Sequence, residues 1–152
     1  MKSTSPRVRN AAFYGLVAIF AVLVTWLVGG LWRVARPLFP LIAALAIAFG
    51  LLGLLVVVLT ARLGERRLRK VFFLLAGASA AGIPIFAVLH NLVYGLFIVW
   101  FGKGFWESHG MADEPVFFIL AILICPALFV ISSAASIVLM IRSRPHTPAD
   151  AP

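Results

Sequence analysis

The sequence predicts an all-α integral membrane protein, a four-helix bundle whose chain runs up, down, up and down. Of its 152 residues, 63% are hydrophobic and only 12% are charged, and the mean hydropathy is +1.10. A soluble domain of this length leaves about 30% of its chain surface in water and carries about a quarter charged residues. Four long apolar runs also contain no Asp, Glu, Lys or Arg, and basic residues gather at their ends.

The four apolar runs predict four membrane-crossing helices in one domain, 1–152. They cover about residues 11–32, 38–61, 71–101 and 116–141. A helix crosses a hydrocarbon core of about 30 Å with roughly 20 residues, and all four runs are long enough. They do not alternate between polar and apolar residues, as barrel strands do. The first run is longer than the roughly 7–15 apolar residues of a signal peptide, so we expect a retained helix.

The connectors and prolines predict where the helices turn and bend. The first connector, 33–37, must turn the chain, and Pro37 and Pro40 suit the opening of the second helix. The third run is too long for a straight crossing, so it must tilt, kink or leave the core. Pro84 and Pro126 are the predicted kink positions. Residues 143–152 are predicted to form a flexible tail.

Basic residues predict the orientation of the chain. Of the 13 Lys and Arg residues, ten lie in the N-terminal tail, the second connector (62–70) and the C-terminal tail, and three lie in the other two connectors. Lys and Arg concentrate on the cytoplasmic side of membrane proteins, so both termini should be cytoplasmic, most simply in a plasma membrane. The net charge of +8 therefore does not point to nucleic acid, for which no motif is present.

Small residues predict where the helices pack closely. Glycine, alanine and serine allow close approach of helices in lipid. We expect a packing seam between the third and fourth helices, and a second close-approach surface on the second helix at Gly50 and Gly53. An alternative for the seam is a narrow polar pathway lined by serine hydroxyls. The residues of the expected seam are Gly77, Ala78, Ala81, Gly82, Ser132, Ser133 and Ser136.

A sparse polar layer is predicted in the outer half of the bundle. Its members, counted from the midpoint of each helix, are Thr25, His90, Asn91, Tyr94 and Cys125. An ionisable group at such a depth is a candidate functional site. Neutral histidine can both donate and accept a hydrogen bond, so we interpret His90 and Asn91 first as ties between helices. The alternative is a ligand, cofactor or proton role for His90.

The third connector contains a weak candidate for a metal site. Glu107, His109, Asp113 and Glu114 supply carboxylates and one imidazole, but without a defining spacing. We interpret the segment instead as a solvated loop whose Phe105 and Trp106 rest on the membrane interface. Asp113 and Glu114 also precede the fourth helix, where acidic residues favour the positive helix end. Neither a metal nor a cofactor is predicted.

The functional prediction depends on which chemical groups and motifs are absent from the sequence. The spans contain no carboxylate that would couple protons or cations, and no Ser-His-Asp set, HExxH or P-loop is present. We therefore expect a protein that is not an enzyme, a structural or accessory membrane subunit that packs in the bilayer against itself or another membrane protein. The alternative is a small oligomeric transporter or channel subunit with a polar layer around His90. A third hypothesis is metal sensing by the outer loop.

Overall fold

The computed structural model describes residues 6–30, 36–111 and 113–142. Within these residues every regular element is helical, and four spans are long and apolar enough to cross a membrane. They are α1 (Pro6–Val28), α2 (Phe39–Ala61), α3 (Arg67–Phe101) and a fourth span, Pro115–Arg142. The fourth span consists of α5 (Pro115–Ile119), a π-helical segment (Leu120–Ile124) and α6 (Cys125–Arg142). The prediction of a small all-α membrane protein with four apolar helices is confirmed.

Two of the helices begin several residues earlier than the apolar runs from which they were predicted. α1 begins at Pro6 rather than near residue 11, and α3 begins at Arg67 rather than 71. Hydropathy marks the part of a helix that suits lipid, whereas the helix itself continues through the polar residues before it. Pro40 lies in the first turn of α2, as predicted. Residues 31–35, which include most of the predicted first turn, and the predicted tail 143–152 lie outside the described residues.

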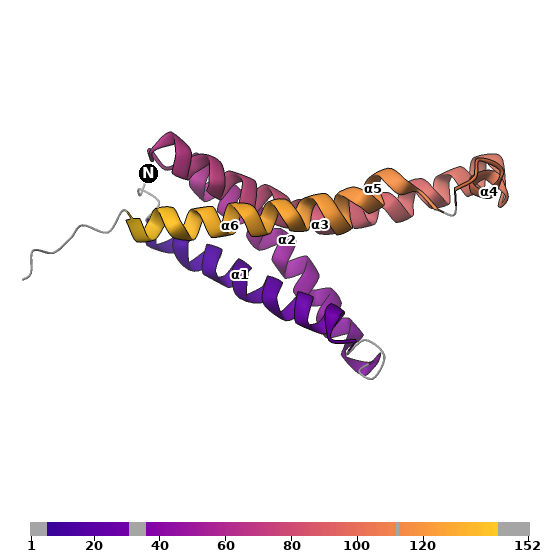
Figure 1. The fold of residues 1–152 in the computed structure, drawn as a ribbon. Helices are drawn as coiled ribbons and strands as arrows, with labels where there is room; N and C mark the ends of the chain where they lie inside the picture. Colours follow the sequence, from indigo (N-terminus) through magenta and orange to yellow (C-terminus); the bar gives the residue numbers. More distant parts are fainter. Residues whose placement is uncertain (1–5, 31–35, 112, 143–152) are drawn as a thin grey trace, which may run out of the picture.

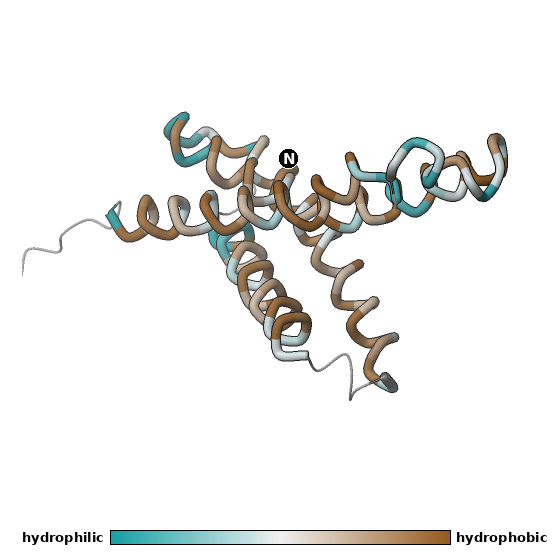
Figure 2. The backbone as a smooth tube through the Cα atoms, turned by 45° about the vertical axis from the view of Figure 1, so that its right-hand side comes forward, coloured by the Kyte–Doolittle hydropathy of each residue, from teal (hydrophilic) through white to brown (hydrophobic). Residues whose placement is uncertain are grey.

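Helix α3 is the central element of the fold. It packs against α2 and against α6, and α1 packs against α2. In Figure 1, α3 runs alongside α5 and α6. Helices α1 and α2 cross these helices at an angle, and their connected ends lie away from α3 and α5. The start of α1 and the end of α6 lie at the same end of the molecule. Figure 2 shows hydrophobic residues along the helices and hydrophilic ones gathered near their ends.

Aromatic rings join all four spans in one apolar core. Phe13 of α1 meets Phe73 of α3 edge to face, with ring centroids 4.9 Å apart. Phe129 of α6 lies 4.6 Å from Phe20 of α1 and 5.3 Å from Phe49 of α2. Such ring pairs contribute about 0.5–1.5 kcal/mol beyond the area they bury. The core therefore holds the crossing region together, where the two pairs of helices meet.

The two prolines within spans have different consequences. Pro126 lacks an N–H, and its ring would clash with a carbonyl one turn earlier. The π-helical segment Leu120–Ile124 accommodates the proline ring, because it widens the helix just before Pro126. Helix α3 continues through Pro84, whose ring packs against α2: a Cβ on Gly50 would lie 2.7 Å from Pro84 Cγ.

The backbones of α2 and α3 touch at a pair of glycines. A Cβ on Gly53 would lie 2.7 Å from the carbonyl oxygen of Gly77, and a Cβ on Gly77 would lie 2.7 Å from the carbonyl oxygen of Gly53. Real Cβ atoms do not approach backbone this closely, so only glycine permits the crossing. Close approach of this kind supplies the dispersion contacts that hold helices together in lipid.

Replacing Gly77 by alanine is expected to force α2 and α3 apart. The new methyl group would meet the Gly53 carbonyl oxygen and, at 2.9 Å, Val57 Cγ2. We expect Gly77→Ala to lower the free energy of unfolding by about 1–3 kcal/mol, the usual effect of overpacking. Gly95→Ala is the matched control, because no other helix or side chain lies within 4 Å of a Cβ there. Denaturant titration in detergent micelles checks this, and equal stability of the two variants would contradict the crossing.

Candidate functional site

The predicted packing residues of α3 contact two different helices, α2 and α6. Gly77 faces α2, whereas a Cβ on Gly82 would lie 2.9 Å from Cys125 Sγ of α6. Ala81 is buried, and Ala78 is exposed. The seam predicted between α3 and α6 is therefore only partly made of these residues, because part of the α3 patch packs against α2 instead.

The serines of α6 are buried, but they do not form a hydrogen-bonded chain. Ser132 Oγ donates to the Leu128 carbonyl of its own helix at 2.5 Å. The hydroxyls of Ser133 and Ser136 have no hydrogen-bond partner among the described residues. Buried hydroxyls without partners cost free energy. These serines are therefore small residues in a tight interface rather than parts of a continuous polar network.

His90 contacts the residues that begin the fourth span. Its Nδ1 lies 3.0 Å from the backbone carbonyl oxygen of Glu114 and 3.4 Å from Glu114 Oε2. Its Nε2 lies 3.3 Å from Asp113 Oδ2. A carbonyl oxygen only accepts, so the ring donates through Nδ1. His90, Asp113 and Glu114 form what we call the His90 cluster, which ties α3 to the start of α5.

Glu114 also caps the helix that follows it. Its side chain, 5% exposed, accepts from the backbone N–H groups of Val116 at 2.8 Å and Phe117 at 2.9 Å. These N–H groups have no partner within the helix, and a carboxylate also suits the positive helix end. The interpretation of Asp113 and Glu114 as residues that favour the start of the fourth helix is confirmed for Glu114.

The five residues of the predicted polar layer do not lie together in the structure. Asn91 is exposed and donates to the Ala87 carbonyl of its own helix at 2.8 Å, so it does not tie two helices together. Thr25 is exposed in the last turn of α1. Cys125 is buried against Gly82, and Tyr94 stacks on Trp106 with centroids 5.8 Å apart. Counting from helix midpoints assumes parallel axes, which these helices do not have.

The four candidate metal ligands of the third connector also do not converge. The Glu114 carboxylate accepts the hydrogen bonds that cap α5, and the Asp113 carboxylate contacts His90. Glu107 is exposed, and His109 Nδ1 lies 2.8 Å from the Phe105 carbonyl oxygen. Among the described residues, no group of three or more His, Cys, Asp or Glu side chains is arranged to hold a metal ion.

Aromatic rings dominate this connector. Phe97 and Phe101 of α3 pack against Phe105 of α4 (Phe105–Ser108), with ring centroids 5.1 and 5.0 Å away from Phe105. Trp106 is buried and its Nε1 donates to the Tyr94 carbonyl at 3.4 Å. The connector is thus folded back on the last turns of α3.

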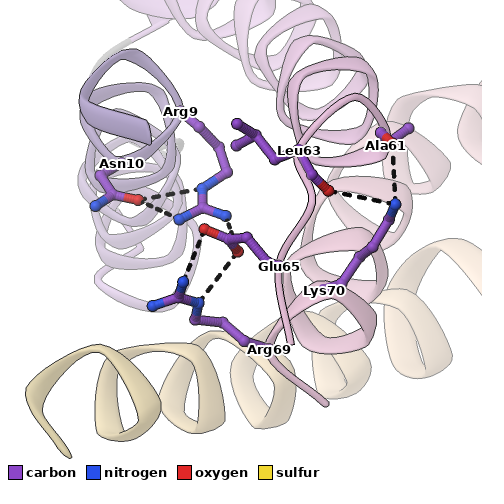
Figure 3. A network of polar contacts seen from close by, with 7 residues as sticks. All are labelled: Arg9, Asn10, Ala61, Leu63, Glu65, Arg69 and Lys70. Carbon is purple, nitrogen blue, oxygen red and sulfur yellow. Dashed lines mark hydrogen bonds and ion pairs between the residues drawn. The ribbon is translucent and has the colours of Figure 1, made fainter. Parts of the chain in front are cut away.

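A buried ion-pair cluster at the opposite end of the molecule was not predicted from the sequence. Glu65, in the connector between α2 and α3, binds Arg9 of α1 and also accepts from Arg69 Nη2 at 3.0 Å and Nε at 3.1 Å (Figure 3). The side chains of Arg9 and Glu65 are only 1% and 7% exposed. The Arg9 guanidinium also lies 3.9 Å from the centroid of the Phe73 ring. We call Arg9, Glu65 and Arg69 the Arg9 cluster.

Two sequence signals would have located the Arg9 cluster. Arg9 lies four residues before Phe13 and seven before Leu16, so these three residues share the helix face that is buried in α1. Glu65 is the only acidic residue in the basic connector, and it lies four residues before Arg69. Lys70 adds a cap, since its Nζ donates to the Ala61 carbonyl at 2.9 Å (Figure 3).

Neutralising Glu65 is expected to destabilise the fold. Glu65→Gln leaves the Arg9 guanidinium buried without its counterion, which typically costs about 3–5 kcal/mol. The double variant Arg9→Met/Glu65→Gln removes both charges and should regain part of that loss. Glu107→Gln, the same change at an exposed site, is the control. Denaturant titration in micelles measures all three, and a double variant less stable than Glu65→Gln would contradict a buried charge pair.

The described side chains thus form two polar regions, the His90 cluster and the Arg9 cluster, at opposite ends of an apolar helical core. Both join separate helices or connectors through polar contacts, and neither has the nucleophile and base arrangement of a hydrolytic site. No protein-family model, curated protein or solved structure matches this chain.

Proposed function

We propose that this protein is a non-enzymatic structural or accessory subunit of the plasma membrane. In this proposal the chain crosses the bilayer up, down, up and down, with both termini in the cytoplasm. It packs laterally against itself or another membrane protein. The orientation is supported by the basic residues at the end of the molecule that holds the Arg9 cluster, since Lys and Arg concentrate on the cytoplasmic side.

The observation that favours a structural role is the position of the ionisable side chains. The apolar runs contain no Asp, Glu, Lys or Arg, and their one histidine, His90, is engaged with Asp113 and Glu114. Proton and ion pathways through membranes rely on ionisable or polar groups that line a cavity. The groove between α2 and α3, which includes Gly50 and Pro84, is lined by apolar residues alone.

The alternative, a transporter or channel subunit, has one supporting observation. The buried hydroxyls of Ser133 and Ser136 lack partners among the described residues, as the lining of a narrow polar pathway would. Such a pathway would have to continue to His90. Between these levels Cys125 fills the space against Gly82, and Phe129 is buried in the aromatic core. The structural role therefore fits these contacts better.

Reconstitution in sealed vesicles separates the two functions. We expect vesicles that contain the protein to hold proton, potassium and chloride gradients as long as empty vesicles do, because the apolar core offers no charged or hydrated path. Fluorescence-quenching and ion-selective dyes measure the leaks. A protein-dependent flux that His90→Ala abolishes would contradict the structural role and assign the alternative.

Lateral packing is measured in the same vesicles. Energy transfer between donor- and acceptor-labelled copies should exceed the random value and persist as lipid is added, if the subunit packs against itself. Transfer that falls to the random value would instead assign the packing to another membrane protein.

A further inference from the structure

A basic pocket lies between the start of α3 and the end of α6. It has a volume of about 690 Å³ and is lined by Arg66, Leu68, Arg69, Leu139 and Arg142. Three of these five residues are arginines that come from two different helix ends. Arg66 and Arg142 are exposed, and Arg69 also binds Glu65. The pocket thus adjoins the Arg9 cluster through Arg69.

The charge around this pocket is far from balanced. Glu65 is the only acidic residue in the described segments that meet here, and two guanidiniums already share it. The basic residues in the same segments are Arg7, Arg9, Arg62, Arg66, Arg67, Arg69, Lys70 and Arg142. An anion is therefore attracted to this end of the protein, and the pocket is where three arginines converge on one volume.

The start of α3 increases this attraction. Arg66 is the N-cap residue, no side chain caps the helix, and no acidic residue stands in its first turn. A helix N-terminus is equivalent to about half a positive charge, and its first N–H groups need acceptors. Arginines there are electrostatically unfavourable for a helix of 35 residues. A bound anion would offset that repulsion.

The remaining lining residues indicate which anion fits. Leu68 is 60% exposed, and Leu139 belongs to the apolar span of α6, so the pocket combines guanidiniums with apolar side chains. Guanidiniums bind phosphate oxygens in bidentate geometry. A phospholipid offers a phosphate that is joined through glycerol to apolar acyl chains. Basic pockets between membrane helices are suited to anionic headgroups for this reason.

We propose that the pocket formed by Arg66, Arg69 and Arg142 binds the phosphate headgroup of an anionic glycerophospholipid. Arg66 and Arg142 contact the phosphate from α3 and α6, and Arg69 holds one side of the pocket through its bonds to Glu65. Leu68 and Leu139 pack against the first carbons of the acyl chains. The bound lipid joins α3 to α6 at this end, where the described residues show no ion pair between the two helices.

Native mass spectrometry of the purified full-length protein tests this binding. The protein is taken up in micelles and titrated with phosphatidylglycerol or, separately, with phosphatidylcholine. We expect discrete binding of phosphatidylglycerol and weaker binding of phosphatidylcholine. The double variant Arg66→Gln/Arg142→Gln should lose roughly thirtyfold in phosphatidylglycerol affinity, the ratio that corresponds to about 1 kcal/mol for each of two arginines at a membrane surface.

Arg67→Gln is the matched control. It removes one charge from the same helical turn, but Arg67 does not line the pocket. We expect its affinity for phosphatidylglycerol to stay within about twofold of the parent protein, and Arg142→Gln alone to lie between the parent and the double variant. Equal losses in Arg67→Gln and Arg142→Gln would overturn the pocket in favour of general surface charge.

Inorganic phosphate and glycerol phosphate distinguish a lipid from a soluble anion. Neither should displace phosphatidylglycerol at tenfold molar excess, because neither fills the apolar part of the pocket. Displacement by either compound would overturn the lipid assignment and identify a site for soluble phosphate.

Discussion

A membrane span must satisfy its polar groups within the protein, because hydrocarbon offers no hydrogen bonds. Apart from a few buried groups such as the hydroxyls of Ser133 and Ser136, the described chain meets this constraint in two ways. Within the spans, Ser132 and Asn91 donate to carbonyls of their own helices. At the span ends, charged side chains pair or cap, as Glu114 does at the start of α5 and Glu65 does between Arg9 and Arg69. The apolar middle is left to packing.

Packing in lipid depends on shape, since lipid tails are as apolar as the side chains. The α2–α3 contact uses the two facing glycines, and the other spans join it through phenylalanine rings. Both features lie where the two pairs of helices cross. Beyond the crossing, α1 and α2 diverge from α3 and α5, as Figures 1 and 2 both show. The helices are therefore tightly packed at the crossing and separate beyond it.

The apolar runs predicted the existence of the four spans, because length and composition alone decide whether a helix suits a membrane. The contacts between particular side chains of different helices were harder to predict from the sequence. The polar layer assumed that equal distances from helix midpoints mean equal depth, and divergent axes break that relation. His90 instead meets Asp113 and Glu114, because the fourth helix begins beside it. The Arg9 cluster was missed because basic residues at a span end were interpreted only as orientation signals.

The side of the membrane that each connector occupies tests the central claim, four crossings with the basic end in the cytoplasm. Single cysteines at Gly64, Lys103 and Arg142, three exposed positions, are placed in a Cys125→Ala background. Intact cells are treated with a membrane-impermeant maleimide. Four crossings with a cytoplasmic basic end predict labelling of Lys103→Cys alone, with Gly64→Cys and Arg142→Cys labelled only after permeabilisation. Labelling of Gly64→Cys and Lys103→Cys from the same side would contradict it.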